Sequence, residues 1–289
     1  MNPNVDRFDF SPIVSRPRIE LPGNARVAVY LIVNVEAWDF TRAVARQYFG
    51  APGGAAVVPD VPNWSWHEYG MRVGIWRMME SLQKRNLRAS IAINGKVIDS
   101  EYRPVAQAAL DAGWNFMGHG YNQVPLHLAQ DQNAEITRTY ETIKRFTGKA
   151  PSGWLGPGLH ETPETLDLLA AAGYRFVVDW PLDDQPVQMR VKAGSMLAVP
   201  YSVETGDLPM MVAHQHDSSV WLARIRDQFD RLYAEGVDQP RVMSMSVHPY
   251  IIGAPHRIRY FEEALDHILG HQDVWVTTPE DICDRFTSP

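Results

Sequence analysis

Apolar and polar positions follow two periodicities along this chain, and together they predict strands that alternate with helices. Residues 26–33 are almost uninterruptedly apolar, which is typical of a strand buried on both faces. Further short apolar runs predict strands near 88–93, 114–118, 151–155, 175–179, 196–200, 241–247 and 273–276. Helical periodicity is found near 66–84, 101–112, 132–147, 162–172, 218–235, 256–269 and 279–286. The alternation predicts an α/β fold with a mainly parallel sheet that can close as a barrel.

The same pattern suggests the domain organisation. Residues 1–25 are Pro-rich and aperiodic and are expected to form an arm over the body of the protein. Residues 26–289 contain no repeat, linker or low-complexity tract, so we expect one domain. The Gly/Pro-rich segment 50–64 is expected to be a loop that covers a site.

Polar side chains follow several predicted strands, where the active sites of parallel α/β folds gather. Candidate acid–base residues are Asn34, Glu36, His119, Asp179 and His248. Candidate substrate-binding residues at the same strand ends are Trp154, Pro157, Trp180 and Tyr201. Two histidines, two or three carboxylates and several aromatic residues converging on one rim favour hydrolysis by acid–base catalysis.

Each candidate also has a structural interpretation. Glu36 could be a paired surface carboxylate, His248 could bond a loop carbonyl, and Asp179 could cap the following segment. Seven other histidines are interpreted as exposed or structural: His127, His160, His214, His216, His256, His267 and His271. The sequence contains no G-x-S-x-G elbow, Walker A motif or dinucleotide fingerprint, which argues against serine catalysis and nucleotide chemistry.

The segment Gly118-His119-Gly120-Tyr121-Asn122-Gln123 bears on whether a metal takes part. A second histidine four residues after His119 would complete a common ligand pair for a divalent metal, but Gln123 stands there. An amide oxygen is a weak ligand for zinc. The expected cofactor is therefore none, or a weakly held metal such as zinc bound by Glu36, His119 and Gln123.

Composition narrows the class of protein. The 289 residues carry a formal charge of −7, which argues against a nucleic-acid partner or an anionic membrane surface. The polar N-terminus has no signal-peptide pattern, and the longest apolar runs are too short to span a bilayer. The lone Cys283 fits a reducing compartment. We expect a cytoplasmic protein that acts on a small molecule.

A series of short motifs carries a family resemblance over residues 20–288. They include Val33-Asn34-Val35-Glu36-Ala37, 66–74, Met117-Gly118-His119-Gly120, 153–158, Asp179-Trp180, Pro200-Tyr201-Ser202 and Ser246-Val247-His248-Pro249. In this order the series resembles the polysaccharide deacetylase (NodB-homology) superfamily, and most closely its intracellular branch of PuuE-type allantoinases and cyclic imidases. The resemblance implies a distorted (β/α) barrel with fewer than eight regular strands, hydrolysis of C–N or ester bonds, and a homo-oligomer, with a tetramer favoured.

Carried over by position, the resemblance also implies roles. Asn34 stands where metal-bearing relatives have an acidic base, Glu36 at the metal-binding carboxylate, and His119 and Gln123 at the two histidine ligands. His248 matches the general acid, and Trp154 replaces an arginine that often opens the third motif. Because two key positions depart from the pattern, we expect ring-opening hydrolysis of a small cyclic amide, imide or ureide. A metal-dependent sugar deacetylase and a catalytically degenerate binding protein remain as alternatives.

Overall fold

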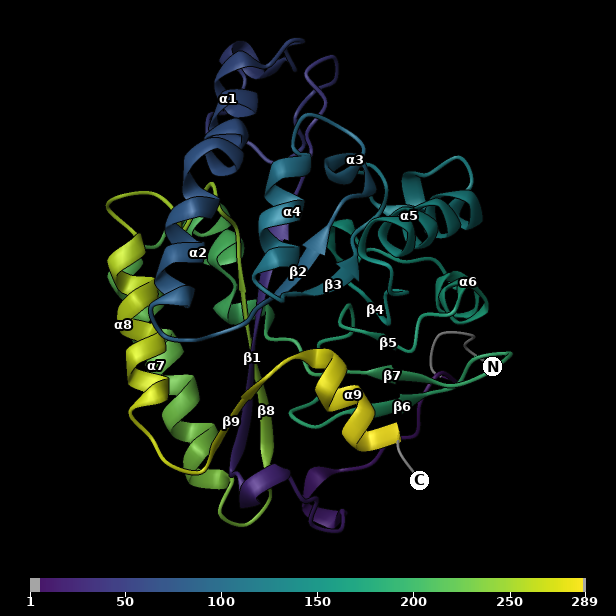
Figure 1. The fold of residues 1–289 in the computed structure, drawn as a ribbon, viewed down its shortest axis with the longest axis vertical. Coiled ribbons are helices and arrows are strands. Elements are labelled where there is room, and N and C mark those ends of the chain that lie inside the picture. The colour runs from purple at the N-terminus through teal and green to yellow at the C-terminus, as the bar shows by residue number, and fades with distance from the viewer. Residues whose placement is uncertain (1–5, 288–289) are drawn as a thin grey trace.

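The computed structural model describes residues 6–287, which form a nine-stranded sheet curled into a half-open barrel (Figure 1). The strand order is β6-β7-β5-β4-β3-β2-β1-β8, with β9 paired to β1, and β6 alone runs antiparallel to its neighbour. The strands are β1 (Val27–Val35), β2 (Ser90–Ile93), β3 (Asn115–Gly118), β4 (Gly153–Trp154), β5 (Phe176–Val177), β6 (Val187–Met189), β7 (Met196–Ala198), β8 (Arg241–Val247) and β9 (Val274–Thr277). Strands β4 to β7 have only two or three residues each. The predicted distorted barrel with fewer than eight regular strands is therefore confirmed.

Helices cover the outside of this sheet. Figure 1 shows α2, α7 and α8 along one side and α5 and α6 along the other. The helices are α1 (Val61–Tyr69), α2 (Ile75–Gln83), α3 (Gly95–Ile98), α4 (Arg103–Asp111), α5 (Gln132–Thr147), α6 (Thr165–Ala172), α7 (Ser218–Glu235), α8 (Ile258–Leu269) and α9 (Pro279–Thr287). The prediction matches both bounds of α5 and α7 and misses only α3 among these helices and β6 among the strands.

The helix predicted at 66–84 differs from the structure. It begins earlier, at Val61, because the Asp60 side chain accepts a hydrogen bond from the Asn63 N–H and caps the first turn. It also contains a π-helical turn at Gly70–Gly74, between α1 and α2. A Cβ on Gly74 would lie 2.0 Å from the Pro249 carbonyl oxygen, so only glycine allows this close contact with the segment after β8.

Strand β1 explains how polar side chains reach the barrel interior. Successive side chains of a strand face opposite sides. One set packs outward against the helices and consists of Val27, Val29, Leu31, Val33 and Val35. The alternate residues Ala28, Tyr30 and Ile32 face inward. The same alternation brings Asn34 and Glu36 to the inner face at the end of the strand.

The open side of the barrel is bridged by loops. The Val242 N–H of β8 donates to the Asp184 carbonyl at 2.8 Å, and the Tyr30 hydroxyl donates to the Pro200 carbonyl. The first five residues of the predicted arm 1–25 lie outside the described residues. Ion pairs fasten its described remainder to the body: Arg7–Asp167 at 2.8 Å, Arg190–Asp9 at 2.8 Å and Arg16–Asp183 at 2.5 Å.

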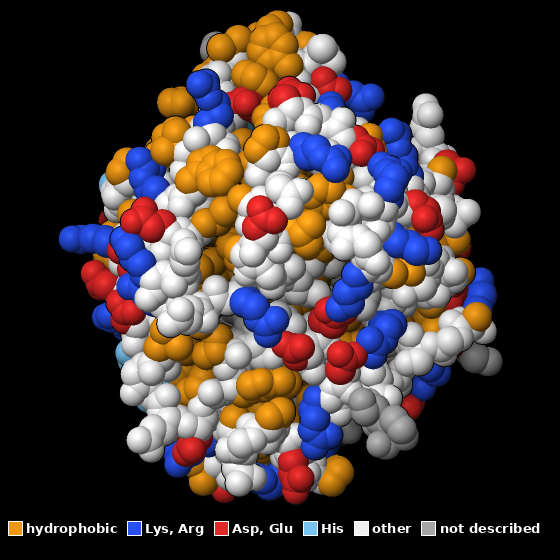
Figure 2. Space-filling view, in the orientation of Figure 1, with side chains coloured by type: hydrophobic (Ala, Val, Ile, Leu, Met, Phe, Trp, Pro, Cys, Tyr) orange, Lys and Arg blue, Asp and Glu red, His pale blue; other side chains and the backbone are white. Residues whose placement is uncertain are grey.

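The surface carries charges of both signs among scattered apolar groups (Figure 2). Exposed apolar side chains gather around α1 and the segment before it: Phe40, Tyr48, Phe49, Val57, Val58 and Val61. Apolar side chains stand out at the top of Figure 2, where Figure 1 places α1. Within residues 6–287, no helix combines the length and apolar character that crossing a membrane requires.

Candidate active site

A cavity of about 270 Å³ opens at the carboxyl ends of the strands. The structure brings six of the predicted residues to its wall: Asn34, Glu36, His119, Gln123, Tyr201 and His248. Arg46 and residues from the segments 155–159 and 203–213 complete the wall. Among the described side chains of residues 50–64, none lines the cavity, so the segment predicted to cover the site does not form its wall.

Glu36 is the centre of the hydrogen-bond network. Its Oε1 accepts from Gln123 Nε2 at 2.7 Å and lies 3.4 Å from His119 Nε2. Its Oε2 accepts from Trp38 Nε1 and the Tyr250 hydroxyl, both at 3.1 Å. Burial by itself raises the pKa of Glu36, but the hydrogen bond with His119 and the charge of His248 outweigh it and lower the pKa to about 2. Glu36 is therefore an anion at neutral pH.

The amide of Gln123 is oriented by a chain of bonds that starts at the backbone. The Ala37 N–H can only donate, and it donates to Asn94 Oδ1 at 2.9 Å. The Asn94 amide nitrogen must then donate, and it bonds the His119 carbonyl and Gln123 Oε1, the latter at 3.0 Å. Gln123 therefore turns its N–H₂ group, and not its oxygen, toward Glu36.

His119 is held at the end of β3 with one nitrogen directed to Glu36. Its Nδ1–H donates to the Leu155 carbonyl, which leaves Nε2 facing Glu36 Oε1. The turn after it needs glycine, because Gly120 has a φ of 72° and an added Cβ would lie 2.8 Å from the Asn122 carbonyl oxygen.

His248 and Asp207 form a buried dyad. Asp207 has no exposed surface and accepts from both the backbone N–H and the Nδ1–H of His248, each at 2.7 Å. This arrangement leaves His248 Nε2 facing the cavity, 3.8 Å from Glu36 Oε1. Burial lowers the pKa of His248, but the negative charges of Asp207 and Glu36 outweigh it, and the net pKa is raised above 6.5. The dyad therefore favours the protonated form of His248 at the cavity wall.

Asn34 is oriented as an acceptor. Its amide nitrogen donates to Ser246 Oγ at 2.9 Å and to the Val247 carbonyl at 3.2 Å. Both amide hydrogens are thereby used, and among the described residues none donates to its Oδ1. The Asn34 atom that a ligand in the cavity can contact is therefore Oδ1. This oxygen can accept a hydrogen bond from a substrate N–H, but it cannot stabilise a developing oxyanion by donating one.

Four predicted residues lie away from the cavity wall. Leu155 lines the cavity, so the preceding Trp154 faces the opposite side and packs with Tyr174 in the outer core. Pro157 is buried behind the wall, and Trp180 packs edge-on against Phe8 of the arm. The structure therefore places none of these three at the cavity wall.

Asp179 is the fourth, and it supports a loop. Both of its oxygens accept from the Gly156 N–H, at 2.7 and 3.0 Å, so it fixes the turn that carries Gly156 to the cavity. Burial raises the pKa of Asp179 to about 6. The structure places it behind the wall and out of reach of a substrate in the cavity.

Several site residues were missed from the sequence. Asp207 follows a 3-10 turn at Val203–Thr205, well beyond the end of β7, so the strand-end rule does not find it. Arg46 lies in an irregular segment with no distinctive pattern. Tyr250 could have been found, because it follows His248 by two residues and therefore extends the same strand end.

The comparisons with known proteins agree with this geometry. The sequence profile of the family described as polysaccharide deacetylase matches residues 66–177. A peptidoglycan deacetylase of Helicobacter pylori is 28% identical over 256 residues, which cover 74% of this chain and 84% of that protein. These matches show that the chain resembles the polysaccharide deacetylase superfamily. The names of this family and this relative describe hydrolases, and the similarity supports a hydrolase of this type.

Solved structures share the fold of this chain. PuuE allantoinase superimposes with a TM-score of 0.83 at 22% identity, covering 94% of this chain and 93% of that one. A structure described as a probable polysaccharide deacetylase from Pseudomonas aeruginosa gives 0.82 at 24% identity, covering 94% of each chain. The fold is therefore shared by proteins named for different substrates.

The residues at the site do not fit a zinc ion. Zinc in a hydrolase takes three protein ligands and an open position. Glu36 and His119 offer two donors, but the third position presents the Gln123 N–H₂ group, which has no lone pair to give. His248 does not replace it, because in the described chain Glu36, His119 and His248 do not bring three ligand atoms within 4.8 Å of one another. The site is better described as a carboxylate, Glu36, that accepts hydrogen bonds from Gln123, Trp38 and Tyr250.

Proposed function

We propose that this protein hydrolyses a C–N bond in a small cyclic amide, imide or ureide, opening the ring without a metal. The observation that carries the proposal is the orientation of Gln123, whose N–H₂ group faces Glu36 where the resemblance implies a metal ligand. The side chains that remain are an ionised carboxylate, Glu36, and a histidine whose protonated form is favoured, His248. Such a pair suits general base and general acid catalysis.

In the proposed reaction, water attacks the ring carbonyl. Glu36 takes a proton from the water while the water oxygen forms a bond to the carbonyl carbon. His248 then gives a proton to the ring nitrogen as the C–N bond breaks. The products are an open-chain acid and an amide or urea group, with one water added. The proton on Glu36 then returns to His248, whose Nε2 is 3.8 Å from Glu36 Oε1. Each positioned acid or base contributes about 10²–10⁴-fold.

The low pKa of Glu36 favours an activated substrate. A carboxylate with a pKa of about 2 is a weak base, so it assists attack best on a carbonyl that is already electrophilic. The carbonyl of an imide or ureide ring is activated by its neighbours, and its nitrogen leaves more easily than that of an N-acetyl sugar. The weak base and a set of site residues that does not fit zinc therefore both favour a cyclic imide or ureide as substrate.

The cavity itself supports a small planar ligand. Its volume of about 270 Å³ lies just below the roughly 300–1,000 Å³ of pockets for drug-sized ligands. Asn34 Oδ1 can accept the N–H that imides and ureides carry. Arg46 places a cation on the wall, where it can bind the carboxylate that ring opening creates.

The alternative is a metal-dependent sugar deacetylase, which the family match and the Helicobacter pylori relative favour. One experiment separates the two functions. Purified protein is screened by NMR against succinimide, hydantoin, dihydrouracil, allantoin and N-acetylated chitooligosaccharides. We expect ring opening of at least one cyclic substrate, lost in Glu36→Gln and kept in the exposed-helix control Glu141→Gln. Acetate release with every ring left intact would contradict the proposal.

We also propose that the protein works as a cytoplasmic homotetramer on a small-molecule substrate. The exposed apolar side chains around α1, defined above, are suited to a subunit interface. Light scattering coupled to size exclusion should give a mass of about four chains, and Phe49→Asp should lower it.

A further inference from the structure

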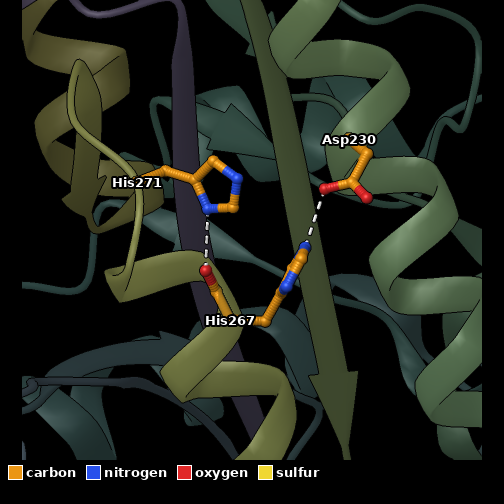
Figure 3. Close-up of side chains that lie close together, drawn as sticks. All are labelled: Asp230, His267 and His271. Atoms are coloured by element: carbon orange, nitrogen blue, oxygen red, sulfur yellow. Dashed lines mark hydrogen bonds and ion pairs between the residues drawn. The ribbon is translucent and has the colours of Figure 1, made fainter.

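A second group of metal-binding side chains lies between α7 and α8, outside the catalytic cavity. Asp230 comes from α7, His267 from the last turn of α8, and His271 from just beyond the end of α8. One ligand atom from each lies within 4.8 Å of the others, and the described residues contain no second group of this kind. Figure 3 shows the three side chains directed toward the space between the two helices.

The hydrogen bonds orient His271 for metal binding. Its Nδ1 lies 2.8 Å from the His267 carbonyl, which can only accept, so Nδ1 carries the proton and Nε2 keeps its lone pair. Metal-bound histidines typically donate their other ring N–H in this way, which fixes both tautomer and ring direction. The chain thus already provides the outer hydrogen bond that a metal-binding His271 needs.

The second contact is close to the required spacing. His267 Nε2 lies 2.7 Å from Asp230 Oδ1. Two ligand atoms bound at about 2.0 Å to a tetrahedral zinc are roughly 3.3 Å apart. The carboxylate must therefore withdraw by only a fraction of an ångström, and the Asp230 side chain is 54% exposed and free to do so. The proton between the two groups leaves to solvent when a metal takes its place.

Aromatic packing holds the rings in place. His271 packs edge-on against Phe229 and Tyr233, with ring centroids 4.9 and 5.1 Å apart, and His267 packs against Phe229 at 5.6 Å. Restricted rings lose less conformational entropy when they bind an ion. These histidines were interpreted as exposed or structural from the sequence, and the structure shows a preorganised pair.

We propose that Asp230, His267 and His271 bind one Zn²⁺ ion, with water at the fourth position. Two imidazole nitrogens and one carboxylate oxygen form a donor set that suits zinc, whereas calcium and magnesium prefer oxygen ligands alone. This inference does not rest on the proposed function.

The ion would join two helices that lead away from the active site. Helix α7 follows the π-helical turn Leu208–Ala213, which lines the cavity, and α8 begins ten residues after His248. Asp230 and His267 lie in the halves of α7 and α8 that are distant from the cavity, and His271 lies just beyond the end of α8. The bound metal therefore stabilises the α7–α8 pair and takes no part in the chemistry.

The test uses the full chain, stripped of metal by a chelator and titrated with zinc chloride by calorimetry. We expect one high-affinity site with a Kd of about 1 µM or tighter. His271→Ala and Asp230→Asn should each weaken binding about 10–100-fold or more, since loss of supporting residues alone costs that much. Zinc should also raise the thermal midpoint of the wild type but not of His271→Ala.

Two controls make the result specific. His214→Ala alters another exposed histidine pair, whose rings lie 6.2 Å apart, and should leave the affinity unchanged. Glu36→Gln should also leave it unchanged, because the catalytic cavity is separate. His271→Gln is a conservative variant that keeps the fold. The inference is wrong if this variant binds zinc as tightly as wild type, or if Glu36→Gln abolishes zinc binding.

Discussion

Replacing Asp207 with asparagine changes the proton donor without changing the shape of the site. Asp207 is wholly buried and accepts two hydrogen bonds from His248, both at 2.7 Å. Asparagine has one oxygen to accept with, so its N–H₂ group must face one of the two donors. The variant therefore loses one charge-assisted bond and the negative charge that raises the pKa of His248.

The expected effects have a definite size and sign. A hydrogen bond to a charged group contributes about 1.5–3 kcal/mol, so the free energy of unfolding should fall by about this amount. The pKa of His248 is raised in the folded state, so its stabilising contribution is full below pH 6.5 and is lost as pH rises through the raised pKa. Wild type and variant should therefore differ most in stability at acid pH. Loss of the general acid should lower kcat about 10²–10⁴-fold at neutral pH.

The stability and titration assays need no knowledge of the substrate. NMR titration of the imidazole gives the pKa of His248 directly, and urea denaturation at pH 6 and pH 9 gives the stability difference. Asp238→Asn, at an exposed position after α7, serves as the matched control and should change neither quantity. If the pKa of His248 is the same in Asp207→Asn as in wild type, the proposed role of the dyad is refuted.

Three further substitutions test other parts of the site. Glu36→Gln should lower kcat about 10²–10⁴-fold while circular dichroism shows an unchanged fold, and a fully active variant would exclude Glu36 as the base. Gln123→His adds the missing imidazole beside Glu36 and His119. In a His271→Ala background, which removes the other proposed zinc site, calorimetry should therefore detect new zinc binding. The absence of binding would contradict the account of this position. Arg46→Ala should weaken binding of the ring-opened product about 10-fold or more, measured as product inhibition, and unchanged inhibition would remove Arg46 from the site.

Much of the fold could be predicted because helices and strands here follow their periodic patterns. The bounds of α5 and α7 match, since both helices have clear apolar stripes and aspartates at their N-caps. Strand β6 was missed because it has three residues and pairs at the edge of the sheet. The π-helical turn Gly70–Gly74 was missed because it depends on contact with Pro249, far along the chain.

The candidate site was predicted only where side-chain direction follows from strand alternation. Asn34, Glu36, His119 and His248 reach the cavity as expected, whereas Trp154 faces away because Leu155 next to it faces in. The amide orientation of Gln123 could not be predicted. It depends on bonds that begin at the Ala37 N–H and pass through Asn94, and only the folded chain brings these groups together.

The most direct test of the central claim is the ring-opening rate of protein freed of metal. The protein is treated with chelator, its metal content is determined by elemental analysis, and hydrolysis of the best cyclic substrate is followed with and without added zinc. Our account predicts that the metal-free protein retains its full rate and that zinc does not increase it. The account would be contradicted if the wild-type protein, with Glu36 intact, lost its activity when the metal was removed and regained it with one equivalent of zinc.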